Sequence, residues 1–200
     1  MKDFNQGTMV DDFITLRPSS YALNKLESFE YVKLWYFTPK GCLDAAKSQQ
    51  SQADDTFSLA KVSESLALRQ LSAIKASCNA IKDADLTWKQ MMMGKVMFLQ
   101  HAQEASWPAS HLNSLAHFFV NLKIHPYRLH PYGERSLTLY QAKVCCNWHD
   151  KLKHNQAFNI SIINENLLQS ISSEVMDKAH LNGIREVSNP RPYLVDLNAD

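Results

Sequence analysis

The stretch Leu137–Leu152, LTLYQAKVCCNWHDKL, carries the clearest structural signal in the chain. Large apolar side chains recur in it every three or four residues, which is the spacing of one face of an α-helix. A half-buried strand would instead alternate apolar and polar side chains. The stretch therefore predicts a helix whose buried side is formed by Leu137, Tyr140, Val144, Trp148 and Leu152.

Three further segments show the same helical spacing. The first is expected to begin at Asp85, an N-cap residue, the second lies between Pro108 and Pro126, and the third ends near Gly183. Four helices with short connections predict a mainly α fold, a compact antiparallel bundle of about four helices. The expected buried side chains are Trp88, Met92, Val96 and Leu99 in the first segment, Leu112, Leu115, Phe119 and Leu122 in the second, and Ile163, Leu167, Ile171 and Val175 in the third.

A different pattern precedes these helices. Phe29–Thr38, FEYVKLWYFT, is dense in aromatic and β-branched residues and predicts a short N-terminal β-strand. A lone strand leaves its backbone groups unpaired, so this one would need a partner strand or a partner chain. Tyr31, Trp35 and Phe37 are the expected partner-interface residues of such a strand. Thr38 and Pro39 predict the N-cap and first residue of a short helix that follows.

The 200 residues suit one domain with loose ends. We expect a loose N-terminal arm at 1–25, a single helical domain at 26–187 and a C-terminal tail at 188–200. Within the domain, a polar linker near 48–56 is expected to be mobile, and a weaker helical segment to cover 62–81. The scarcity of glycine, five residues in all, argues against a sandwich or barrel with many tight turns.

The four cysteines, Cys42, Cys78, Cys145 and Cys146, follow no disulfide framework. We expect them to be reduced, as in an intracellular protein of the cytosol or nucleus. The longest uncharged run, Ala105–Leu122, contains Pro108, histidine and asparagine, so no membrane span and no membrane partner are expected.

One stretch of the chain is basic. Residues 123–153 carry six basic and two acidic side chains, a net charge of +4, while the whole chain carries +1. Cations neutralise phosphates and flat rings stack on unpaired bases, so this face is a candidate nucleic-acid interface. Tyr140 and Trp148 lie on the buried helix stripe and are excluded. The candidate residues are Lys123, Tyr127, Arg128, Tyr132, Arg135, Lys143, Lys151 and Lys153.

Histidine and cysteine offer a weaker alternative. Cys145 and His149 are one helical turn apart and, with His125 and His130, contain the ligand types of a zinc site. Their spacing matches no known zinc motif, and a small buried thiol with structural histidines explains the same residues. Glycine-rich phosphate loops and the GxSxG and HExxH motifs are also missing from the sequence. We assign no catalytic residues, no metal ligands and no cofactor.

Several segments resemble a family of uncharacterised proteins recurrent in mushroom-forming fungi. The resemblance covers roughly residues 29–180 and implies a loose association with mobile-element-rich genomic regions; it implies no activity, cofactor or site residue. It rests on EYVKLWYFTPKGC at Glu30–Cys42, LTWKQM at Leu86–Met91, HPY at His125–Tyr127, NWHDKLK at Asn147–Lys153 and FNISIINENLL at Phe158–Leu168.

Three functional hypotheses follow. The first is a non-enzymatic binding domain that contacts nucleic acid through the 123–153 face, as a mobile-element accessory protein. The second is a protein-interaction or self-assembly module, in which the aromatic segment 29–38 adds to the sheet of another protein or of a second copy. The third is a metal-dependent enzyme.

Overall fold

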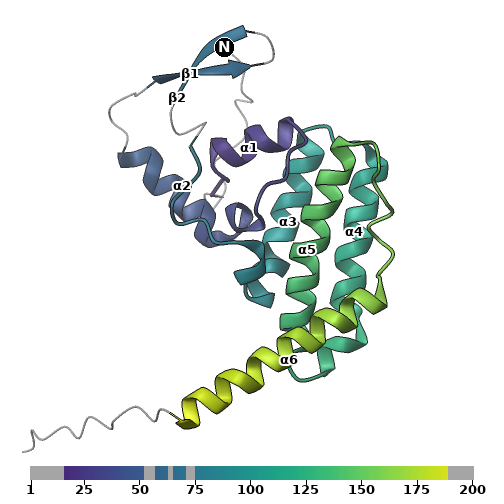
Figure 1. Cartoon of the computed structure of the whole chain (residues 1–200). Coiled ribbons are helices and arrows are strands. Elements are labelled where there is room, and N and C mark those ends of the chain that lie inside the picture. Colours follow the sequence, from purple (N-terminus) through teal and green to yellow (C-terminus); the bar gives the residue numbers. More distant parts are fainter. Residues whose placement is uncertain (1–15, 52–56, 63–64, 71–74, 189–200) are drawn as a thin grey trace, which may run out of the picture. The chain divides into compact units, whose positions relative to one another are not determined.

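A computed structural model describes residues 16–51, 57–62, 65–70 and 75–188. The described chain is mainly α, as predicted, with six α-helices, three short 3-10 helices (η) and one β-hairpin (Figure 1). In chain order the elements are α1 Ser20–Glu27, η1 Leu34–Phe37, α2 Pro39–Ser51, β1 Phe57–Val62, β2 Ser65–Gln70, η3 Asp83–Asp85, α3 Trp88–Glu104, α4 Ala109–Ile124, η4 Pro126–Leu129, α5 Gly133–Lys153 and α6 Glu165–Ser188.

Two compact units divide the chain, where the sequence predicted one helical domain. The first combines Met1–Lys82 with Gln90–Trp107, and the second combines Asp83–Lys89 with Pro108–Asp200. All four predicted long helices form, as α3 to α6. Because nearly all of α3 belongs to the first unit and α4 to α6 belong to the second, a single four-helix bundle stays a prediction.

In the first unit, the predicted strand at 29–38 is wrong. Leu34–Phe37 is a 3-10 helix, and all four of its side chains are buried. Consecutive strand residues point to opposite faces, so a strand would turn half of them away from one core. The tight turn of η1 instead directs them inward, and Phe37 meets Phe98 of α3 edge to face, with ring centroids 5.5 Å apart.

The end of η1 sets the start of α2 as the sequence predicted. Thr38 accepts a hydrogen bond at Oγ1 from the N–H of Gly41, 3.2 Å away, which is the N-cap arrangement. On the other side of η1, Gly94 of α3 lets the helix approach closely. A β-carbon added there would lie 2.9 Å from the carbonyl oxygen of Leu34. The aromatic segment is therefore core-forming material for the first unit.

Other expectations for the N-terminal half need correction. Residues 1–15 of the expected loose arm lie outside the described residues, but within 16–25 helix α1 begins at Ser20, where Ser19 accepts the N–H of Ala22 at 3.3 Å, and Ala22 is fully buried. The weak helix expected at 62–81 is wrong where the structure describes it. Residues 57–62 and 65–70 form two antiparallel strands with Leu59 opposite Leu68, and the apolar pairs Phe57 and Leu59, and Leu66 and Leu68, have the period of two typical of strands.

Parts of the remaining expectations lie outside the described residues. Of the polar linker at 48–56, residues 48–51 belong to α2, and 52–56 are outside. The C-terminal tail at 188–200 lies outside from residue 189 onward.

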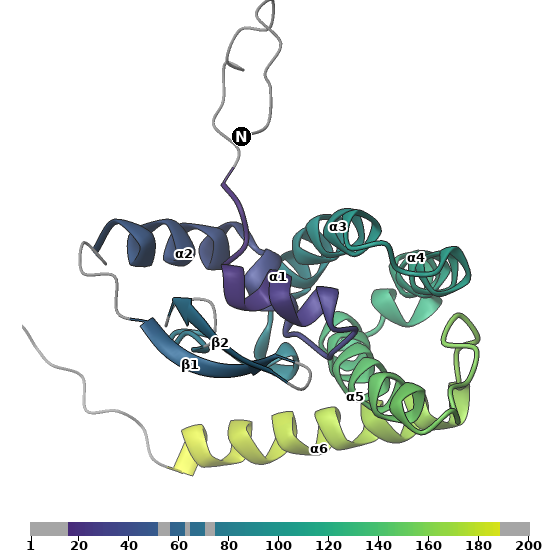
Figure 2. The ribbon, with the colours of Figure 1, turned by 90° about the horizontal axis from the view of Figure 1, so that it is seen from above.

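In the second unit, α4 and α5 lie side by side and α6 crosses them (Figure 2). Phe118 of α4 faces Tyr140 of α5 with ring centroids 6.3 Å apart. The α5 stripe is buried as predicted, apart from Leu152, which is half-buried. Both Phe118 and Phe119 are buried. Trp148 donates its indole N–H to the carbonyl of Phe158, 3.0 Å away, and so ties the chain beyond α5 back to that helix.

The predicted faces of α3 and α6 are displaced. On α3 the buried side chains include Met91 and Phe98, while Val96 from the predicted stripe is exposed. On α6 the N-terminal part of the stripe is displaced: Leu168 is fully buried while Leu167 is exposed. The predicted stop near Gly183 is also wrong, because α6 continues to Ser188.

Substitutions in the methionine run Met91–Met93, at the start of α3, test which face of that helix is buried. Met91 is fully buried and Met93 is 44% exposed. Met91→Ala should lower the free energy of unfolding by about 2–5 kcal/mol, since it leaves a cavity. Met93→Ala, the matched control, should change it by less than about 0.5 kcal/mol. Urea denaturation measures both, and equal losses would mean that α3 buries a different face.

Candidate functional site

The connection between α4 and α5, residues 125–132, is called here the α4–α5 loop. It contains η4 and both copies of the HPY tripeptide. Pro126 follows the end of α4 directly, and Gly133 opens α5. A β-carbon at Gly133 would lie only 1.8 Å from the carbonyl oxygen of Tyr127, so the backbone packs back on itself here in a way that only glycine allows.

Arg128, a predicted phosphate ligand, holds the α4–α5 loop together instead. Its guanidinium donates to Glu134 Oε1 at 2.8 Å and to the carbonyl of Lys123 at 2.9 Å. The same group lies over the ring of Trp88, 4.9 Å from its centroid. Its charge is therefore already paired within the chain, and each of its two terminal nitrogens donates one hydrogen bond.

The two tyrosines of the loop differ in what they contact. The ring of Tyr127 stacks on His130 with centroids 5.0 Å apart and planes 14° apart. Tyr132 is 53% exposed and adopts a left-handed conformation with φ of 59°. That conformation costs a non-glycine residue roughly 1–2 kcal/mol. An aromatic ring is thus held in solvent at the expense of stability.

Exposed apolar and basic side chains gather around this loop. We call Lys123, Ile124, Leu129, Tyr132 and Arg135 the loop surface. Ile124 is 71% exposed and Leu129 is 92% exposed, while Lys123 and Arg135 are also exposed. Arg135 donates one hydrogen bond to the carbonyl of Ala84. A guanidinium has five N–H donors, so Arg135 can donate further hydrogen bonds to a ligand. The combination of cations with an exposed ring and aliphatic side chains is suited to binding an anionic partner that has flat or apolar groups.

The remaining predicted basic residues lie away from this surface. Lys143 pairs with Glu174 of α6 at 3.1 Å, and Lys151 donates to Gln156 Oε1 at 3.1 Å. Lys153 is exposed at the last residue of α5. Arg135 and Lys153 are separated by about 27 Å along the helix, at 1.5 Å per residue. The structure therefore spreads the predicted 123–153 face along the whole length of α5.

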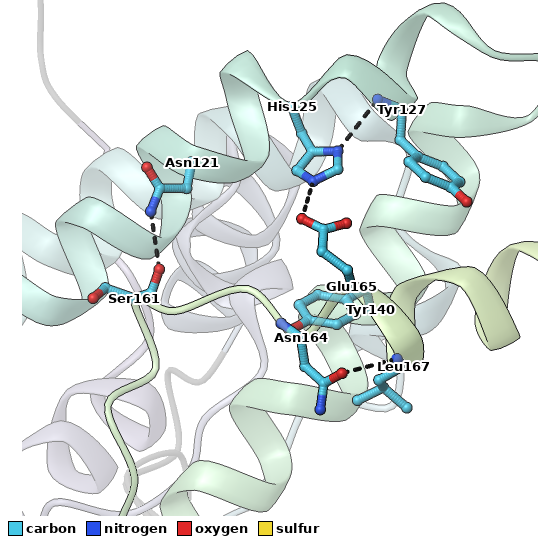
Figure 3. A network of polar contacts seen from close by, with 8 residues as sticks. All are labelled: Asn121, His125, Tyr127, Tyr140, Ser161, Asn164, Glu165 and Leu167. Atoms are coloured by element: carbon cyan, nitrogen blue, oxygen red, sulfur yellow. Dashed lines mark hydrogen bonds and ion pairs between the residues drawn. The ribbon is translucent and has the colours of Figure 1, made fainter.

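A network of polar contacts joins the loop to the start of α6 (Figure 3). His125 accepts the N–H of Tyr127 at Nδ1, 3.2 Å away, and its Nε2 lies 3.1 Å from Glu165 Oε1. Asn164 donates its backbone N–H to the hydroxyl of Tyr140 at 2.8 Å. The Asn164 side chain caps α6 by accepting the N–H of Leu167 at 3.0 Å.

A second contact supports the same junction from α4. Asn121 donates its side-chain N–H to the carbonyl of Ser161, 2.9 Å away (Figure 3). The segment that leads into α6 is thus attached to both α4 and α5. The position of Glu165 beside the loop follows from these attachments.

The predicted partner interface is wrong for two of its three residues. Trp35 and Phe37 are fully buried within the chain, and Tyr31 is half-buried. The aromatic segment 29–38 forms no strand, so it offers no edge to a partner sheet. The apolar density that suggested an interface is the density of a core.

The Cys145–His149 pair does not have the properties of a reactive site. Both side chains are buried on α5, and burial raises the pKa of the Cys145 thiol to about 12. A catalytic or metal-binding cysteine needs the thiolate, which a lowered pKa favours. Among the described residues, no three His, Cys, Asp or Glu side chains lie close enough together to hold a metal ion.

Sequence reasoning found the loop but missed several of its features. Ile124 and Leu129 carry no sequence signal that would distinguish them from core residues. Glu165 lies 40 residues beyond His125, and only the folded chain brings the two together. From the sequence, the glycine at 133 indicates only that a turn lies nearby, and it does not indicate that Tyr132 adopts a left-handed conformation.

Thiol labelling tests the environment of the cysteines. Cys78 and Cys146 are exposed, whereas Cys42 and Cys145 are buried and burial raises both of their pKa values. Iodoacetamide at pH 8 should therefore modify Cys78 and Cys146 in the folded protein and spare the other two. Peptide mass spectrometry reads the sites, with urea-denatured protein as the control in which all four react. Modification of Cys145 as fast as Cys146 would contradict the buried site.

Backbone strain at Tyr132 gives a second test. Tyr132→Asn should raise the free energy of unfolding by about 0.5–1 kcal/mol, because asparagine tolerates the left-handed conformation. Tyr132→Thr removes the same exposed ring but is β-branched, so it should lower stability. Urea denaturation compares the two variants. If they shift stability equally, strain at this backbone position is not the cause.

Comparison with known proteins returned no match: no family model, no curated protein and no solved structure is detectably similar to this chain. In the described part of the chain, no helix combines the length and the apolar character that crossing a membrane requires.

Proposed function

We propose that the chain is a non-enzymatic binding protein whose loop surface contacts single-stranded nucleic acid. The observation that carries the proposal is Tyr132, whose ring is exposed in a strained backbone conformation beside Arg135. Strained residues persist only where the surrounding structure holds them in place, and they cluster at functional sites. An exposed tyrosine between cations can stack on an unpaired base while the cations neutralise the neighbouring phosphates.

The available charges favour a binding site that contacts few phosphates. Of the three cations near the loop, Arg128 is paired with Glu134, which leaves Lys123 and Arg135 to meet phosphates. Two phosphate contacts give weak electrostatic binding, so stacking and apolar contacts must supply much of the affinity. Those contacts need bases that are not already stacked in a duplex. A single strand is therefore the preferred ligand.

A protein partner is the second candidate, supported by Leu129. A leucine that is 92% exposed next to an exposed isoleucine suits a protein-interaction or self-assembly module. This alternative moves the interface from the aromatic segment 29–38 to the α4–α5 loop. Light scattering across a concentration series distinguishes self-assembly from nucleic-acid binding, because only self-assembly gives a concentration-dependent particle size for the protein alone.

The localisation, the mobile-element role, the four-helix bundle and the metal-dependent enzyme are further proposals, each supported by fewer observations. A mobile-element accessory role, and placement in cytosol or nucleus, rest on the resemblance and on cysteine usage alone. A four-helix bundle rests on the helical spacing. A metal-dependent enzyme gains no support from the environment of Cys145, whose thiol has a raised pKa.

Fluorescence anisotropy with labelled single-stranded and duplex oligonucleotides at several salt concentrations tests the proposal. Single strands should bind better than duplex, with a log–log salt slope of about −1.4 for two phosphate contacts. Lys123→Ala and Arg135→Ala should each flatten the slope by about 0.7. Tyr132→Leu should weaken binding by roughly 1–3 kcal/mol through loss of stacking.

Lys151→Ala is the matched control, since it removes a cation at the far end of α5. It should leave both affinity and slope unchanged. A slope that flattens equally in this variant would move the interface away from the loop surface. No binding at low salt would overturn the proposal and favour the protein partner.

A further inference from the structure

His125 stands where the α4–α5 loop meets α6. It ends α4 and is the N-cap residue of η4. Its side chain is only 10% exposed, and each ring nitrogen has one partner. Nδ1 lies 3.2 Å from the backbone nitrogen of Tyr127, and Nε2 lies 3.1 Å from Glu165 Oε1 (Figure 3).

The partners determine where the ring proton is. A backbone N–H can only donate, so Nδ1 must present a lone pair to Tyr127. An ionised carboxylate can only accept, so Nε2 must carry the hydrogen that faces Glu165. Of the neutral and charged forms of imidazole, only the neutral Nε2–H tautomer satisfies both contacts. The hydrogen bonds thus select one protonation state.

Adding a proton changes the two contacts in opposite directions. The proton goes to Nδ1, which then points an N–H at the N–H of Tyr127, and that hydrogen bond is lost. At the same time the contact of Nε2–H with Glu165 becomes an ion pair, which is a stronger interaction. Protonation therefore breaks the hydrogen bond to Tyr127 in the loop and strengthens the contact with Glu165 of α6.

We infer that His125 is a proton-operated latch of the α4–α5 loop: the neutral ring holds the first turn of the loop, and protonation releases it. Histidine is the side chain that changes charge between about pH 5 and 8. The released residue, Tyr127, is also the one that stacks on His130 and packs against Gly133. Its release loosens the base of the loop surface.

Among the groups near the ring, His130 is a second histidine, but its ring stacks on the side chain of Tyr127, whereas His125 accepts the Tyr127 backbone N–H. The titratable and charged residues on the surrounding elements are Lys123 at the end of α4, Tyr127 and Arg128 on η4, His130 after η4, Glu134, Arg135 and Tyr140 on α5, and Glu165 on α6. Arg128 is engaged with Glu134 and the carbonyl of Lys123. Glu165 is the carboxylate in contact with the His125 ring.

Nitrogen-15 NMR of the histidine rings tests the latch directly in the full chain. At pH 7.5, His125 should show a pyridine-like Nδ1 and a pyrrole-like Nε2. On titration to pH 5, the protection factor of the Tyr127 amide against hydrogen exchange should fall by about fivefold, the equivalent of one lost cap. The opposite tautomer, or a protection factor that stays constant while the ring titrates, would overturn the inference.

Two substitutions separate the halves of the latch. His125→Asn keeps an acceptor near the Nδ1 position, but its side chain is too short to bring an N–H to Glu165, so Tyr127 should stay protected at both pH values. His125→Gln keeps a donor that can reach Glu165 but loses the local acceptor, so Tyr127 should be poorly protected at both. If both variants retain the pH dependence of the unmodified protein, another group is responsible.

The latch itself does not depend on what the loop binds; only its regulation of binding rests on the proposed function. Anisotropy with a single-stranded oligonucleotide at pH 7.5 and 5 therefore forms a separate arm. Where the protein binds, affinity should change with pH in the unmodified protein and less in His125→Asn. Loss of Tyr127 protection without any oligonucleotide binding would uphold the latch and reject the proposed function.

Discussion

The hydrogen bond from the backbone N–H of Asn164 to the hydroxyl of Tyr140 is the contact on which the candidate site depends. Burial raises the pKa of Tyr140, so the hydroxyl stays protonated and its oxygen remains available as a neutral acceptor. Asn164 also caps α6, so the contact fixes the point where that helix begins. Glu165 is the next residue, and its place beside His125 follows. A core tyrosine thereby positions a loop that lies on the surface.

Three independent attachments then hold the α4–α5 loop. Gly133 lets the backbone pack against Tyr127, Arg128 clamps the loop to Glu134, and His125 caps its first turn. None of these attachments covers Leu129 or the ring of Tyr132, which remain in solvent. An exposed leucine adds nothing to the core, and the left-handed conformation of Tyr132 costs a non-glycine residue stability. Under the proposed function, such residues on a firmly attached loop form a surface that is preorganised for a partner.

Periodicity predicted the helices well because their stripes repeat over three or more turns. It failed on the faces of α3 and α6, where a choice between neighbouring residues such as Leu167 and Leu168 depends on what the helix packs against. It failed at Phe29–Thr38 because aromatic density indicates burial and not a particular backbone: Trp35 and Phe37 are buried through a 3-10 turn. In the site, the HPY loop was predictable, but contacts between residues far apart in sequence, such as His125 with Glu165, were not.

The basic stretch 123–153 contains more cations than can contact a ligand, because some of them already pair with carboxylates within the chain. Residues 123–153 have a net charge of +4, yet the fold pairs Arg128 and Lys143 with carboxylates and places Lys151 and Lys153 at the far end of α5. A counterion-release mechanism scales with the phosphates actually contacted and not with the charge of a segment. Under the proposed function, recognition by this loop therefore depends on its apolar and aromatic groups, with Lys123 and Arg135 orienting an anionic ligand against them.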